Sequence, residues 1–113
     1  MTNQSYDRGV VVKGPDLLGP HPHRPYVCLS TDDPPFRDEE AVYAVVTTTR
    51  RSVAIPLASA DFTSGGLPRE SYVNPWVLVT IKHADILDTE GKLAEDTVNK
   101  IARDAATHLG ALD

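Results

Sequence analysis

The stretch that decides the fold is HRPYVCLS, residues 23–30, where a Pro-rich loop ends and an apolar, strand-forming run begins. A second run, AVYAVVTT at residues 41–48, ends in hydroxyl groups. If these two segments are neighbouring strands of a small barrel, Arg24 and Thr47 meet at one rim. A guanidinium beside a hydroxyl can hold a phosphate group there.

Shorter strands are predicted on both sides of this pair, because β-branched and aromatic residues recur between Gly- and Pro-rich loops. The expected strands cover residues 9–13, 51–56, 71–73 and 76–82. The short turn after residue 48 favours a hairpin with residues 51–56. Asn74-Pro75 is expected to break the chain between the last two strands.

Residues 94–109 form the only segment with a helical pattern. Apolar residues recur there on one face at the 3.6-residue period, namely at Val98, Ile101, Ala102, Ala105 and Leu109. Many short antiparallel strands closed by one C-terminal helix predict a mainly β (α+β) fold, a small barrel. We expect residues 1–7 to be a flexible N-terminal arm and residues 8–113 to be a single domain.

Composition limits the classes of function. The net charge of −5 argues against a nucleic-acid binder with a broad basic face, although a local cationic site remains open. No segment approaches the roughly 18 apolar residues that span a bilayer, and the N-terminus has no signal pattern, so we expect a cytoplasmic protein without a membrane partner. The single Cys28 excludes an internal disulfide and is expected to be a buried, inert thiol.

A metal site is not predicted. The nearest signal is His21-Pro22-His23, but no third ligand is obvious nearby. The sequence also has no phosphate-binding Gly-rich loop, nucleophile elbow or zinc-protease helix motif. We therefore expect no cofactor.

The order of the segments resembles the MazF/PemK family of toxin endoribonucleases. RGVVV (residues 8–12) and HRPYVCLS match the family's first two strands, and VYAVVTT (residues 42–48) resembles its third, which ends in Thr. LPRESYV (residues 67–73) and LVTIK (residues 78–82) resemble the segments that follow. The resemblance covers residues 8–109.

The resemblance implies a compact SH3-like barrel that forms homodimers and is neutralised by a cognate antitoxin. Such enzymes cut single-stranded RNA without a metal, by attack of the RNA's own 2′-hydroxyl and formation of a 2′,3′-cyclic phosphate. By position, Arg24 matches the family's catalytic arginine and Thr47 its catalytic threonine. The protein must also supply a proton acceptor and a proton donor.

The sequence departs from the family pattern at three places. In the LVTIK segment, Val79 stands where relatives carry an arginine and Lys82 where they carry an aspartate. A glutamate that relatives carry in the first loop is missing, and His21 or His23 could replace it in acid–base chemistry. The later segment reads Asn74-Pro75-Trp76, where Trp76 is either a stacking surface for an unpaired base or a core residue. The further RNA-binding candidates are Asn74, Thr48, Arg50 and Arg51.

Two other functions remain open from the sequence. One is a non-catalytic module on the same barrel, which binds a protein as gyrase-poisoning relatives do, or binds RNA without cutting it. The acidic balance favours this alternative, whereas the pairing of Arg24 with Thr47 favours the nuclease. A structural subunit without a site ranks last.

Overall fold

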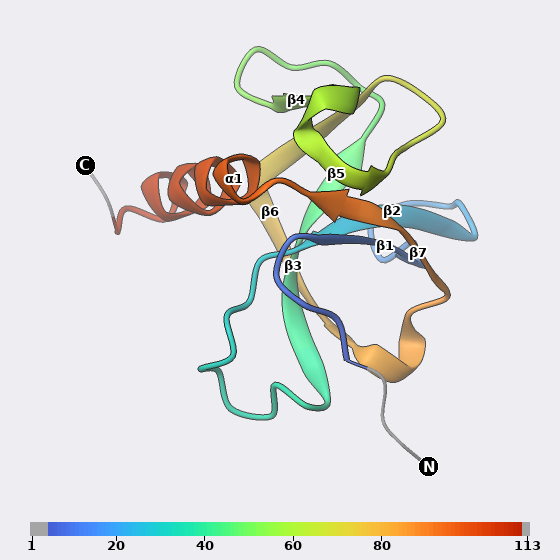
Figure 1. Cartoon of the computed structure of the whole chain (residues 1–113), viewed down its shortest axis with the longest axis vertical. Coiled ribbons are helices and arrows are strands. Elements are labelled where there is room, and N and C mark those ends of the chain that lie inside the picture. The colour runs from blue at the N-terminus through green and yellow to red at the C-terminus, as the bar shows by residue number, and fades with distance from the viewer. Residues whose placement is uncertain (1–4, 112–113) are drawn as a thin grey trace.

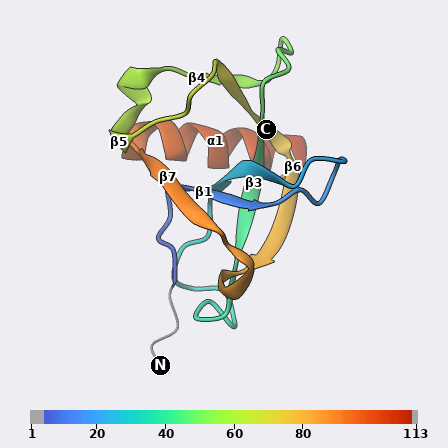
Figure 2. The same cartoon turned by 90° about the vertical axis from the view of Figure 1, so that its right-hand side faces the viewer.

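The computed structural model describes residues 5–111, which form one curled antiparallel sheet with a helix packed across it (Figures 1 and 2). The seven strands lie in the order β4-β6-β3-β2-β1-β7-β5. Their bounds are β1 Val10–Pro15, β2 His23–Cys28, β3 Glu40–Thr47, β4 Ile55–Leu57, β5 Phe62–Gly65, β6 Ser71–Lys82 and β7 Asp88–Leu93. Two short 3-10 helices, Ser59–Asp61 and His83–Asp85, precede β5 and β7, and the helix α1 spans Glu95–His108.

The predicted mainly β fold with one terminal helix is confirmed, and α1 differs from its predicted bounds by one residue at each end. Acidic residues occupy its first turn and His108 its last, which suits the helix dipole. Val98, Ile101 and Ala105 of the predicted apolar face are buried. The helix is therefore held by burial of this face against the sheet.

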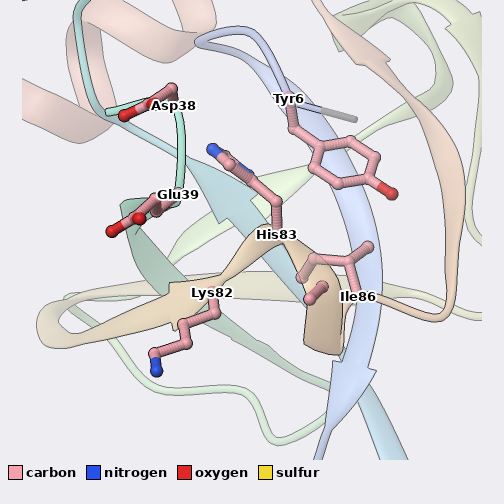
Figure 3. Close-up of a pocket in the computed structure, with 7 residues that line it drawn as sticks. Tyr6, Asp38, Glu39, Lys82, His83 and Ile86 are labelled. Carbon is pink, nitrogen blue, oxygen red and sulfur yellow. The ribbon is translucent and has the colours of Figure 1, made fainter. Parts of the chain in front are cut away.

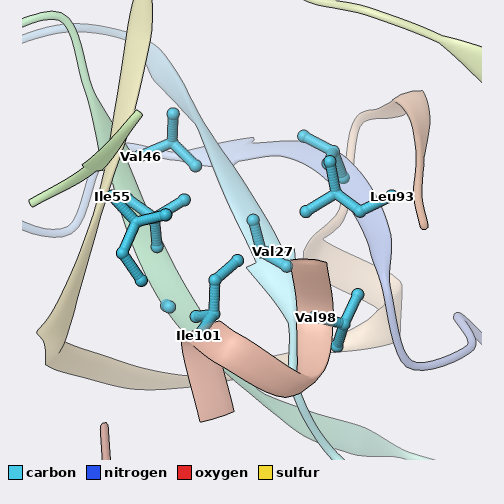
Figure 4. Packing of buried hydrophobic residues seen from close by; sticks show 9 residues of the cluster. Val27, Val46, Ile55, Leu93, Val98 and Ile101 are labelled. Atoms are coloured by element: carbon cyan, nitrogen blue, oxygen red, sulfur yellow. The ribbon is translucent and has the colours of Figure 1, made fainter. Parts of the chain in front are cut away.

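The central strands are buried on both sides, which explains their almost continuous apolar sequence. Val27 faces a cluster with Val98 and Ile101 of the helix (Figure 4), whereas its neighbours Tyr26 and Cys28 face a second cluster. Cys28 is fully buried, as predicted, and burial raises the pKa of its thiol.

The predicted hairpin after β3 is wrong. β4 pairs with β6 and not with β3, placing Ile55 opposite Val73. The edge of β3 is not free, because β6 pairs along it from Tyr72 to Lys82. Residues 48–53 are instead an exposed loop.

Two further expectations need correction. β5 and β7 lie outside the predicted strands, because their polar and glycine-containing sequences lack a strand pattern, yet they pair with each other. β6 is not broken at Asn74-Pro75. A register shift opposite Ala44 and Val45 lets the strand bulge there, and a bulge accommodates a proline that lacks the ladder N–H.

The start of the described chain is anchored to the sheet. Tyr6, in the segment predicted as a flexible arm, is buried and packs against His83 with ring centroids 5.6 Å apart. The guanidinium of Arg37 donates hydrogen bonds to the backbone oxygens of Tyr6 and Thr31. Residues 1–4 of that arm lie outside the described residues. Within residues 5–111, no helix is long and apolar enough to cross a membrane.

Candidate active site

A cleft of about 520 Å³ lies where β2 begins and β3 ends. The β2–β3 pairing runs from Cys28 opposite Tyr43 to Tyr26 opposite Val45. Arg24 lies two residues before Tyr26 and Thr47 two residues after Val45, and both line the cleft. The β1–β2 loop and the segment between β5 and β6 extend toward the same side of the molecule (Figure 1). Together they form the walls, and the lining residues are Lys13, His21, His23, Arg24, Pro25, Val46, Thr47, Thr48, Thr49, Leu67, Pro68, Arg69, Ser71 and Glu90.

Arg24 is held from behind by a carboxylate. Its Nε lies 3.1 Å from Oδ1 of Asp16, whose side chain has no exposed surface. The side chain of Arg24 is 22% exposed and lines the cleft. The contact is an ion pair, since Nε has no hydrogen-bond partner among the described residues, and it leaves the two Nη groups for a ligand.

Asp16 also organises the loop that carries the two histidines. Its Oδ1 accepts hydrogen bonds from the backbone N–H groups of Leu18 and Gly19, each at 3.0 Å, and its Oδ2 accepts one from His21 at 3.3 Å. Burial raises the pKa of this carboxyl. The Leu18 hydrogen bond and the charge of Arg24, helped by the other two N–H groups, outweigh burial and lower the pKa below its ordinary value.

The root of this loop is fixed by Tyr26. Its hydroxyl donates a hydrogen bond of 2.6 Å to the backbone oxygen of Pro15 and accepts one of 3.2 Å from the N–H of Leu17. The tip of the loop is exposed, so the imidazoles of His21 and His23 reach both the cleft and solvent. Imidazoles in such a position can exchange protons with a bound substrate and with water.

The hydroxyl of Thr47 already accepts one hydrogen bond. Its Oγ1 accepts a hydrogen bond of 3.1 Å from the backbone N–H of Thr49. This turn holds the half-buried Thr47 at the end of β3, and it leaves the hydroxyl hydrogen to be donated into the cleft.

The cleft is locally cationic although the chain is acidic. Lys13 and Arg69 join Arg24 in its lining, whereas Glu90 is the only carboxylate among the lining residues. Glu90 lies 3.7 Å from Lys13, so its charge is partly compensated. Such an arrangement favours an anionic ligand with several oxygens, such as a phosphodiester.

Some predicted site residues lie elsewhere. Arg50 and Arg51 are in the exposed loop between β3 and β4, and neither lines the cleft. Asn74 and Trp76 lie at the bulge of β6, also outside the cleft lining. Trp76 is half-buried and meets His108 of α1 edge to face, with ring centroids 5.4 Å apart.

A second hollow, of about 430 Å³, lies at the opposite end of β6 and contains none of the predicted site residues. Figure 3 shows the carboxylates of Asp38 and Glu39 on one side of His83 and the ring of Tyr6 on the other. Lys82 is the one Lys or Arg among its lining residues. Two carboxylates make this hollow a poor host for a phosphate.

Sequence reasoning missed six polar residues of the cleft region, two of which are Thr49 and Glu90 in the lining. Lys13 ends an apolar strand, and Arg69 and Ser71 belong to the matched LPRESYV segment, but none was proposed for the site. Asp16 stands in Pro-Asp-Leu-Leu-Gly, a composition typical of an Asx turn. That signal predicts its local hydrogen bonds but not its contact with Arg24.

Among the described residues, no group of three or more His, Cys, Asp or Glu side chains is arranged to hold a metal ion. The histidines of the His21-Pro22-His23 signal therefore stand in the cleft without a set of protein ligands around them.

No model of a known protein family and no curated protein matches this sequence. Solved structures do match the fold over nearly the whole chain. An endoribonuclease from a mycobacterial species superposes with a TM-score of 0.74 and 27% identity, covering 95% of this chain and 93% of its own.

Two further structures agree with the first. A mycobacterial endoribonuclease in complex with its cognate antitoxin gives a TM-score of 0.69 and 26% identity, over 94% of this chain and 96% of that one. The Mycobacterium tuberculosis toxin MazF-mt6 gives a TM-score of 0.70 at 20% identity, over 94% and 99%. The last likeness concerns the fold alone. Together these neighbours confirm the resemblance that the strand motifs carry.

Proposed function

We propose that this chain, which has the fold of the MazF-type toxin endoribonucleases, is itself a toxin-type endoribonuclease that cuts single-stranded RNA. The observation that carries the proposal is the cationic cleft, which both Arg24 at the start of β2 and Thr47 at the end of β3 line. The fold supports the class of enzyme, and the cleft supports the substrate.

The reaction that suits these groups is an internal transesterification. The 2′-oxygen attacks the adjacent phosphorus, the bond from phosphorus to the 5′-oxygen breaks, and a 2′,3′-cyclic phosphate remains on one fragment. A base removes the proton from the 2′-hydroxyl, and an acid gives a proton to the departing 5′-oxygen. No water or redox partner is consumed in this step.

Each role has a candidate in the cleft. Arg24 would neutralise the phosphorane through its Nη groups, and Thr47 would donate its hydroxyl hydrogen to a phosphate oxygen. His21 and His23 are the candidates for base and acid, because an imidazole changes protonation near neutral pH. Thr48, also in the lining, would bind the neighbouring nucleotide.

Arg50, Arg51, Asn74 and Trp76 are proposed only as contacts to RNA beyond the cleft, since none of them lines it. We also propose that an antitoxin covers the cleft, in line with the neighbour that was solved with its cognate antitoxin. We further propose that the chain forms a homodimer and acts in the cytoplasm, where it meets RNA and the antitoxin.

The experiment is incubation of the purified chain with a long single-stranded RNA in EDTA, followed by mapping of the fragment ends. Defined fragments with 2′,3′-cyclic phosphate ends are expected, and a 2′-deoxy nucleotide at the mapped position should abolish that cut. RNA that stays intact at low and high salt would refute the nuclease. The acidic balance speaks for the non-catalytic binding module, but the structural neighbours at 26–27% identity are named endoribonucleases, so the nuclease is the better supported function.

A further inference from the structure

We propose that Asp16 is a positioning residue, which aims the guanidinium of Arg24 into the cleft and fixes the histidine loop against it. This inference rests on the proposed function. Asp16 faces Arg24 and does not line the cleft, so it acts through its neighbours and not on the RNA itself.

The contacts of Asp16 exceed those of a surface ion pair. One carboxylate receives three backbone N–H groups from its own loop and also lies against Arg24 Nε. Its side chain has no exposed surface, although the loop tip around it is open to solvent. A carboxylate shielded in this way keeps one geometry, unlike an exposed pair of flexible side chains.

The geometry explains how a positioning role arises. An arginine can turn about four side-chain bonds, and each bond that stays free must be ordered when the phosphate binds. The ion pair joins Asp16 to Nε, so this contact does not occupy the two Nη groups of Arg24, which lines the cleft. The guanidinium is thus oriented before RNA arrives, which is the condition for strong stabilisation of the phosphorane.

The absence of a side chain at Gly19 leaves room for the carboxylate of Asp16. A Cβ built on Gly19 would stand 3.0 Å from Oδ2 of Asp16, closer than an ordinary contact. The backbone N–H of Gly19 also donates to Oδ1. Any side chain at this position therefore presses on the group that holds Arg24.

The test compares Asp16→Asn with the wild-type chain on the mapped RNA. Asparagine keeps the shape and one acceptor oxygen, but it loses the charge that faces Arg24. We expect kcat to fall by about 10- to 100-fold, the loss typical of a misplaced catalytic group, with a smaller change in KM. Asp33→Asn, an exposed aspartate of the β2–β3 loop, is the matched control and should keep wild-type kcat.

A double-mutant cycle separates positioning from a merely structural role. If Asp16 acts through Arg24, Asp16→Asn should cost almost nothing further in an Arg24→Ala background. Equal losses in both backgrounds would overturn the proposal, and so would wild-type kcat for Asp16→Asn. If Asp16→Asn fails to fold, Gly19→Ala replaces it, and unchanged kcat there would also count against the proposal.

A measurement without catalysis keeps this inference apart from the proposed function. The ¹⁵N–¹H signal of Arg24 Nε should move in Asp16→Asn, because the charged carboxylate 3.1 Å away is lost, whether or not the protein cuts RNA. A 2′-deoxy single-stranded oligonucleotide should bind that variant more weakly than wild type. An unchanged Nε signal would refute the positioning role, whereas intact RNA with a shifted signal would refute only the nuclease.

Discussion

Removing the hydroxyl of Thr47 gives the sharpest prediction for the chemistry. Thr47→Val keeps the branched shape that suits the end of β3 but removes the hydrogen that would be donated to phosphate. A hydrogen bond to a charged group contributes about 1.5–3 kcal/mol. Because about 1.4 kcal/mol corresponds to a factor of ten, kcat should fall by roughly 10- to 150-fold.

The change should cost little stability. Within residues 5–111, the Thr47 hydroxyl forms a hydrogen bond only with the backbone N–H of Thr49. Because this turn is exposed, water can replace the acceptor that Thr47→Val removes. Thr47→Ser retains the hydroxyl and should keep most of the activity. Thr80→Val, at an exposed position of β6 outside the cleft, serves as the control.

The assay is single-turnover cleavage of a short RNA that contains the mapped site, with the unfolding midpoint measured for each variant. Wild-type cleavage by Thr47→Val would remove the hydroxyl from the mechanism. Equal damage by Thr47→Ser and Thr47→Val would show that packing, and not the donated hydrogen, matters at this position.

Three further predictions concern stability and reactivity. Ile101 is fully buried in α1, so Ile101→Ala should lower the free energy of unfolding, measured by urea titration, by about 2–5 kcal/mol. A loss below about 1 kcal/mol would contradict the packing of α1 against the sheet. Because the pKa of Asp16 is lowered in the folded chain, its ionised carboxylate stabilises the fold at pH values above the ordinary carboxyl pKa. This contribution is lost as the pH falls through and below that pKa. The unfolding midpoint of Asp16→Asn should therefore depend less on pH between about pH 5 and 3 than that of wild type. Cys28, whose burial raises its thiol pKa, should react with a thiol reagent such as DTNB only after urea unfolds the chain, so rapid native labelling would refute its burial.

The sequence predicts those parts of the fold in which local pattern and tertiary environment agree. β2, β3 and α1 carry continuous apolar runs or a clear helical period, and they appear close to their predicted bounds. β5 and β7 are stabilised by pairing with each other, and their own polar sequences contain no sign of that partner. The hairpin after β3 failed for a related reason, since the competing strand β6 lies far along the chain.

The candidate site divides in the same way. Arg24 and Thr47 could be brought together by reasoning from the sequence, because the start of β2 and the end of β3 lie at the same end of this antiparallel pair. Strand order and loop conformation bring three further residues to the cleft region, namely Lys13, Arg69 and Asp16. A single sequence does not specify either of them. Trp76 lies against His108 of the helix and outside the cleft lining, and its stacking on a base stays a prediction.

The central claim is that RNA is cut in the cleft around Arg24, and the most direct test is the cleavage rate of Arg24→Ala beside Arg103→Ala. The control removes an exposed arginine of α1 that does not line the cleft. We expect kcat of Arg24→Ala to fall at least about 100-fold, the usual cost of removing a hydrogen-bond donor to the transition state, while the variant stays folded. Arg103→Ala should cut at the wild-type rate. Equal cleavage by the two variants would contradict the claim.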